Sequence, residues 1–127
     1  MATRSRPLSP HLTVYRWALS MVMSIVHRVT GIALYVGTLF LLIFVGAAAI
    51  GDEALASVSW LYGSWFGQLV LFGYTWALFH HMLGGLRYFV WDTGHGFERH
   101  VRTWMVRGNL IGSIVLTLAA WAIFVWF

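Results

Sequence analysis

Two short stretches of this chain place ionisable side chains inside otherwise apolar sequence. The first, SIVHRVTG, carries Ser24, His27 and Arg28 at spacings that share one face of a helix. The second, HHMLGGLRYFVWD, runs from His80 to Asp92 at the end of a long apolar segment. Ionisable side chains are costly in lipid, so both stretches indicate a functional site.

The second stretch has the residues that a haem ligand needs. A neutral imidazole is a good axial ligand for haem iron, and glycines leave room for a flat cofactor. Adjacent histidines on a helix point about 100° apart, so only one of the two can face a given site. His80 remains an alternative, but the longer one-face series favours His81, since it comprises His81, Gly85, Tyr88 and Asp92.

The cationic side chains near these histidines suggest two kinds of ligand. Haem propionates are anionic, and Arg28, His27 and Arg87 lie at about the depth where they could bind them. Ser24 and Arg28, one turn apart, could instead donate hydrogen bonds to a quinone carbonyl. Asp92 could relay protons to a quinone, or could neutralise Arg28 or Arg87.

Each of these side chains also has an interpretation without a cofactor. A membrane histidine could hydrogen-bond across a helix interface, and the pair Gly84-Gly85 could serve helix packing. Arg87 could extend to the lipid headgroups, and Ser24 could bond its own backbone. Spacing alone leaves these alternatives open.

Composition limits the class of protein. The 127 residues are 60% hydrophobic and 9% charged, with a mean hydropathy of +0.76, which indicates an integral membrane protein. Long apolar runs favour α-helices over a barrel. All basic residues are arginine, so the net charge of +4 reflects membrane-flanking positions and no nucleic-acid surface. The absence of cysteine excludes disulfides and iron–sulfur ligation.

We therefore predict one all-α membrane domain with three transmembrane helices and an N-terminal cytoplasmic arm. The arm covers 1–19, the helices cover 20–50, 64–91 and 108–127, and an interfacial lead-in precedes the second helix over 54–63. Residues 92–107 form a cytoplasmic loop. Arginines place the N-terminus and this loop on the inner side, because the connection at 51–53 has none.

Three runs resemble one known family, the cytochrome b subunit of succinate dehydrogenase in respiratory complex II: RPLSPHLTVYR, SIVHRVTG and HMLGGLRYFVWDTGH. The resemblance implies that His81 is the axial ligand of haem b and that His27 lies near its propionates. It implies ubiquinone binding by Ser24 and Arg28, with Asp92 nearby. Tyr88 is a departure, since some members have histidine there. The implied haem pocket comprises His27, Arg28, Gly85, Arg87 and Tyr88.

The resemblance also implies a function within a larger enzyme. The chain would anchor the complex in the bacterial cytoplasmic membrane, or the mitochondrial inner membrane, and pass electrons from an iron–sulfur subunit to ubiquinone in respiration and the tricarboxylic acid cycle. Succinate oxidation would belong to a flavoprotein subunit, and a second small membrane subunit would share the haem. A trimer of such heterotetramers, a menaquinone-using fumarate reductase anchor and a non-redox structural helix bundle stay open.

Overall fold

The computed structural model describes residues 11, 14 and 16–126, with side chains described as far as Phe124. Four helices account for most of this part: α1 Leu19–Ile50, α2 Asp52–Gly63, α3 Trp65–Asp92 and α4 Arg99–Trp126. The three long ones are apolar and long enough to cross a membrane. The all-helical membrane fold is thereby confirmed, while most of the predicted arm lies outside the described residues.

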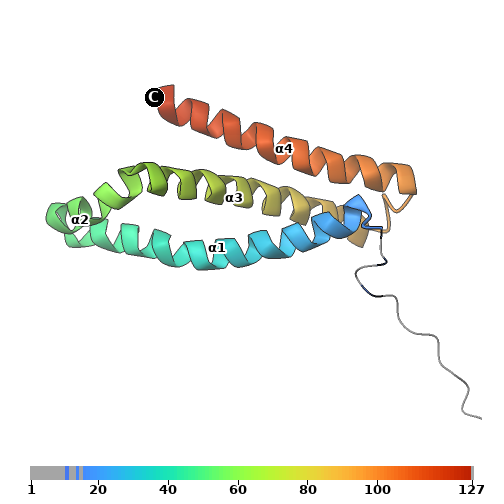
Figure 1. Cartoon of the computed structure of the whole chain (residues 1–127), viewed down its shortest axis with the longest axis horizontal. Coiled ribbons are helices and arrows are strands. Elements are labelled where there is room, and N and C mark those ends of the chain that lie inside the picture. Colours follow the sequence, from blue (N-terminus) through green and yellow to red (C-terminus); the bar gives the residue numbers. More distant parts are fainter. Residues whose placement is uncertain (1–10, 12–13, 15, 127) are drawn as a thin grey trace, which may run out of the picture.

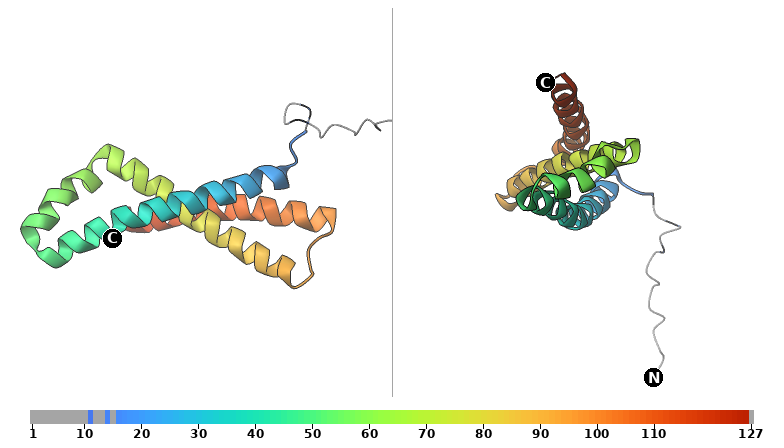
Figure 2. Two further views of the ribbon diagram at one scale, coloured as in Figure 1. Left: turned by 90° about the horizontal axis from the view of Figure 1, so that it is seen from below. Right: turned by 90° about the vertical axis from the view of Figure 1, so that its left-hand side faces the viewer.

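The long helix α3 is the centre of the bundle. It packs against both α1 and α4, and it lies between them in Figure 1. The short helix α2 joins α1 to α3 at the end far from the α3–α4 connection, and the end-on view in Figure 2 shows α4 leaning away from the other helices. Side chains of α3 can therefore meet α1 on one side and α4 on the other.

Local sequence explains where the helices begin and end. Gly51, between α1 and α2, has a φ of 138°, a conformation that side-chain-bearing residues rarely adopt. Asp52 and Glu53 occupy the first turn of α2, where acidic groups stabilise a helix. The hydroxyl of Ser64 accepts a hydrogen bond of 3.1 Å from the Gly67 amide and caps the start of α3.

Two connecting segments are more helical than their composition indicated. Residues predicted as an interfacial lead-in form most of α2, and α4 begins at Arg99 within the segment predicted as a loop. Arginine is a good helix former, so charge alone does not end a helix, and the turn signal is confined to Gly94 and Gly96. Which of these residues lie in the bilayer stays a prediction.

The polarity of the bundle is reversed relative to a soluble protein. The largest fully buried side chains are His80, Val106, Ser113 and Thr117, whereas many leucines, isoleucines and phenylalanines are exposed. Lipid can cover apolar side chains, so membrane helices use small and polar residues where they meet. Buried polar groups are consequently the informative positions in this chain.

Candidate functional site

The polar faces of α1 and α3 meet in a pair of stacked histidines. The rings of His27 and His81 lie with centroids 4.1 Å apart and planes 12° from parallel. The ring of Tyr88 meets His27 edge-on, with centroids 5.2 Å apart. The two stretches that stood out in the sequence thus form one cluster.

Each histidine donates a hydrogen bond to the other's backbone. His81 Nδ1 lies 3.1 Å from the His27 carbonyl oxygen, and His27 Nε2 lies 3.3 Å from the His81 carbonyl oxygen. A carbonyl oxygen can only accept, so both ring nitrogens carry a proton. In neutral His81 the lone pair is then on Nε2, the nitrogen left available for a metal ion.

Glycines of the opposite helix make room for both rings. A Cβ atom at Gly84 would come within 2.2 Å of His27 Cδ2, and one at Gly31 within 2.9 Å of His81 Cε1. A Cβ atom at Gly85 would meet no described atom within 4 Å. The two glycines of α3 therefore have different surroundings: Gly84 allows helix packing, and Gly85 leaves open space one helical turn from His81 on the same face.

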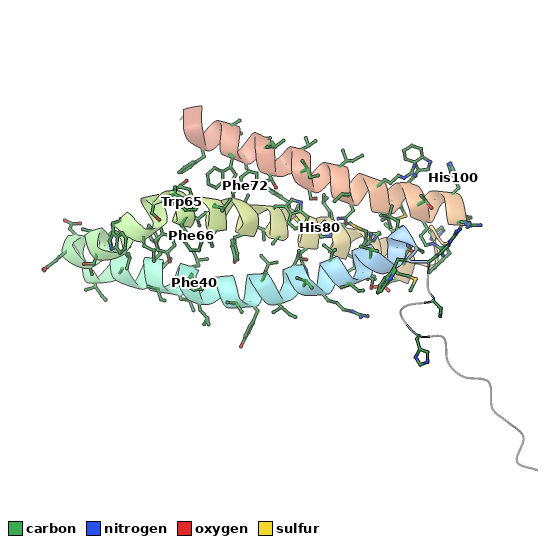
Figure 3. All side chains as sticks on the ribbon, viewed as in Figure 1. Phe40, Trp65, Phe66, Phe72, His80 and His100 are labelled. Carbon is green, nitrogen blue, oxygen red and sulfur yellow. The ribbon has the colours of Figure 1, made fainter. Side chains whose placement is uncertain are left out.

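The neighbouring histidine, His80, faces the other side of α3. Figure 3 shows it between α3 and α4, and only 1% of its surface is exposed. Asn109 Nδ2 donates to its Nδ1 over 3.1 Å, and its ring stacks on Trp76 with centroids 5.1 Å apart. His80 therefore takes part in the contact between α3 and α4, whereas its neighbour His81 faces α1.

A pocket beside the histidine pair gathers most of the remaining predicted residues. Its volume is about 400 Å³, and Ser24 and Arg28 line it together with Arg87 and Tyr88. The other lining residues are Trp17, Ser20, Met21, Ile25 and Trp91. Hydrogen-bond donors and aromatic rings thus surround one space at this end of the bundle.

Arg87 does not extend outward as a lipid-anchoring arginine would. Only 5% of its surface is exposed, and its guanidinium carbon lies 5.0 Å from the Trp91 ring centre and 5.5 Å from that of Tyr88. Its Nε and Nη1 atoms are buried and have no hydrogen-bond partner among the residues that the structure describes. The alternative in which Arg87 reaches the headgroups is wrong for this conformation, and its unpaired donors fit an anion.

Asp92 stands apart from this pocket. It is exposed at the end of α3 and does not line the cavity. Asp92 is a described residue and makes no hydrogen bond to the buried Nε and Nη1 atoms of Arg87, so it does not neutralise that arginine through them. Its proposed part in quinone binding stays a prediction.

The interpretation of the sequence missed two polar residues that contact the histidines. Thr30, 3% exposed, donates from Oγ1 to the His27 carbonyl over 2.9 Å, and Asn109 binds His80 from α4. Thr30 follows His27 by three residues, a spacing that places them on one face. Asn109 is an isolated amide side chain at the start of an apolar stretch, and this isolation in the sequence could have indicated a buried polar contact.

The larger cavity of the bundle lies at the opposite end. Its volume is about 610 Å³, and its lining includes Phe40, Phe66, Tyr62 and Gln68 but no ionisable acid or base apart from tyrosine phenols. Figure 3 shows Phe40 and Phe66 far from His80 along the bundle. Of these two cavities, the one lined by arginines is thus at the end with the histidines.

The residues around His81 fit a haem better than a bare metal ion. Among the residues that the structure describes, no three histidine, cysteine or acidic side chains gather as a metal-binding set. A porphyrin supplies four ligands of its own, so one protein imidazole per side is enough. The available Nε2 of His81, the space at Gly85 and the unpaired Arg87 donors agree with that requirement.

Three apolar helices with paired histidines at one end define a small membrane-embedded helical subunit. Residues 2–126 match the family described as succinate dehydrogenase/fumarate reductase transmembrane subunit, and the chain belongs to this family. It is 38% identical over 120 residues to the succinate dehydrogenase cytochrome b556 subunit of Paracoccus denitrificans, covering 94% of this chain and 92% of that one.

Two further relatives extend the comparison. Identity is 31% over 119 residues with the cytochrome b556 subunit of Rickettsia conorii, covering 91% of this chain and 90% of the relative. Identity is 41% over 96 residues with the mitochondrial cytochrome b560 subunit of Sus scrofa, covering 72% of this chain and 56% of the relative. All three relatives bear the name of a succinate dehydrogenase cytochrome b subunit.

Proposed function

We propose that this chain is the haem-b- and ubiquinone-binding membrane anchor of a succinate dehydrogenase, and that it passes electrons from an iron–sulfur subunit to ubiquinone. The observation that carries the proposal is His81, whose Nδ1 is bonded to a carbonyl so that Nε2 keeps the lone pair, one helical turn before the open position at Gly85. Family membership supplies the enzyme context. Succinate oxidation itself belongs to a flavoprotein subunit.

His81 would hold the iron of the haem, which would supply one-electron chemistry when bound. His27 stacks on the ligand and holds its position through the reciprocal hydrogen bonds. Arg87 and Arg28 provide positive charge for the propionates. Of the two, Arg87 would gain more from a bound anion, because its buried donors find no partner among the described residues. A second small membrane subunit would share the haem and contribute to holding it.

The pocket beside the histidines is the proposed quinone site. Ser24 can donate a hydrogen bond to a carbonyl oxygen, and Arg28 can stabilise the negative charge that develops on it during reduction. Trp17, Trp91 and Tyr88 offer flat apolar surfaces to the ring. Protons would come from the adjoining aqueous side, where Asp92 lies exposed.

The proposed setting is the bacterial inner membrane, with the N-terminus and the α3–α4 connection facing the cytoplasm. Arginines concentrate at the end of the bundle that holds the histidine pair, and the α1–α2 connection carries only acidic charge. That end is also where an iron–sulfur subunit must dock for electrons to reach the pocket.

A spectral test decides the haem assignment. The co-expressed membrane subunits should show a b-type redox difference spectrum that His81→Ala abolishes. Gly85→Ala should lower haem content at least several-fold, because the added methyl meets no described atom of this chain and would occupy space proposed for the haem. Gly73→Ala is the matched control, since it also meets nothing within 4 Å on the same helix.

An unchanged spectrum in His81→Ala would remove His81 as the ligand. A wild-type complex that contains neither haem nor bound quinone-site inhibitor would favour the non-redox bundle instead.

A further inference from the structure

Thr30 lies where two helices share a hydrogen-bond network around His81. It is one turn beyond His27 on α1, and its side chain is almost fully buried. Its Oγ1 donates to the His27 carbonyl oxygen over 2.9 Å and lies 3.4 Å from His81 Nδ1. The same carbonyl accepts from His81 Nδ1 over 3.1 Å.

The number of protons determines what Thr30 offers to His81. A hydroxyl has one proton, and that of Thr30 is directed to the His27 carbonyl, so only oxygen lone pairs remain for His81. Both oxygens near His81 Nδ1 are therefore acceptors. Together they favour the tautomer with the proton on Nδ1 and the lone pair on Nε2.

The residue after Thr30 restricts the same ring from a second direction. The His81 ring lies over Gly31, where a Cβ atom would come within 2.9 Å of Cε1 and 3.4 Å of Nδ1. The ring is thus held by Thr30 at its Nδ1 edge and by the Gly31 backbone beneath it. The hydroxyl of Thr30 contacts the imidazole of His81, and the missing side chain of Gly31 makes room for the same ring.

We propose that Thr30 is a positioning residue for His81 that favours the iron-binding tautomer and increases the basicity of the ligand. The inference rests on the proposed role of His81 as a haem ligand. A hydrogen bond at the remote ring nitrogen strengthens electron donation to a metal. Thr30 therefore stabilises ferric over ferrous haem.

Redox titration of the assembled complex tests this role through three variants. Thr30→Val keeps the shape and removes the hydroxyl, and Thr30→Ser keeps the hydroxyl. Thr38→Val is the matched control, because Thr38 lies on the same helix and its hydroxyl bonds only its own backbone, to Leu34 over 2.8 Å.

We expect Thr30→Val to lower the equilibrium ratio of ferric to ferrous haem about threefold. This change is smaller than that expected when a strong outer-shell hydrogen bond to a metal ligand is lost. At about 59 mV per tenfold for one electron, the midpoint potential rises by about 30 mV. Thr30→Ser and Thr38→Val should titrate as wild type does. The haem-to-protein ratio, measured in parallel, should fall only in Thr30→Val.

Equal midpoints in Thr30→Val and wild type would overturn the inference, provided that His81→Ala loses the haem. Retention of haem in His81→Ala would instead overturn the proposed function on which the inference rests. If Thr30→Val does not assemble, Thr30→Ala takes its place in the same comparison. Failure of both, with assembly of Thr30→Ser, would assign the hydroxyl to helix packing and also overturn the inference.

Discussion

At the scale of single residues, Arg87 is the clearest sign that this chain is one part of a larger site. A buried cation without a partner costs several kcal/mol in a low-dielectric surrounding. Contacts with Trp91 and Tyr88 offset some of this cost. Among the described residues two of its donor atoms nevertheless find no partner, which agrees with the proposal that an anion binds there.

The proposed quinone contacts can be separated from assembly by activity ratios. Ser24→Ala removes one neutral donor from the pocket, and we expect succinate–quinone activity to fall about 2- to 10-fold. Arg28→Leu removes a charged donor, which we expect to cost about 10- to 100-fold. Succinate–dye activity should remain in both variants, because the dye does not use this pocket.

Ser57→Ala serves as the control for these substitutions, since Ser57 is exposed on α2 and its hydroxyl bonds its own helix. Equal loss of quinone and dye activity would indicate a defect in assembly and contradict the proposed contacts.

At the scale of helices, the contact between α3 and α4 is held by polar side chains. Asn109 Nδ2 donates to His80, and Trp121 Nε1 donates to Thr75 Oγ1 over 3.2 Å. Ser113 and Thr117 are fully buried between these two contacts on the same face of α4. Because adjacent residues point in different directions, fixing His80 toward α4 directs His81 toward α1.

A double-mutant cycle measures this polar contact. Asn109→Leu removes the donor to His80, and we expect a coupling free energy of about 1 kcal/mol between positions 80 and 109, as for other membrane hydrogen bonds. Unfolding in mixed detergent micelles of wild type, Asn109→Leu, His80→Leu and the double variant provides the four free energies.

Ser113→Ala is the control, because its hydroxyl donates to Leu110 of its own helix. A coupling to His80 as large for Ser113 as for Asn109 would refute the specific contact.

Helix existence was predictable from sequence, and helix contacts were only partly so. Apolar length predicts α1 and α3, but the arginines around residue 99 favour a loop in the sequence, whereas in the structure they begin α4. The spacing of Ser24, His27 and Arg28 predicts that they share one face, because all three lie on the same helix. The Asn109–His80 contact did not follow, because the relative rotation of two helices is set by packing. Thr30 was overlooked because a membrane threonine usually bonds its own backbone, which this one also does.

At the scale of the whole molecule, charge distribution predicts a single orientation in the membrane. The chain has no cysteine, so one introduced cysteine is a unique reporter of sidedness. Glu53→Cys on α2 should react with a membrane-impermeant maleimide in intact cells. His95→Cys, in the α3–α4 connection, should react only after permeabilisation, because arginine-rich segments stay inside. The reverse pattern of labelling would contradict the proposed orientation.

The central position of α3 has a consequence for biosynthesis. Among the three candidate spans, α3 is the least apolar, and it carries His80, His81 and the buried Arg87. Such a segment leaves the translocon for lipid less readily than α1, which precedes it. We therefore expect α3 to stay beside α1 during translation until α4 emerges and Asn109 reaches His80, so that stable insertion of α3 depends on the synthesis of α4.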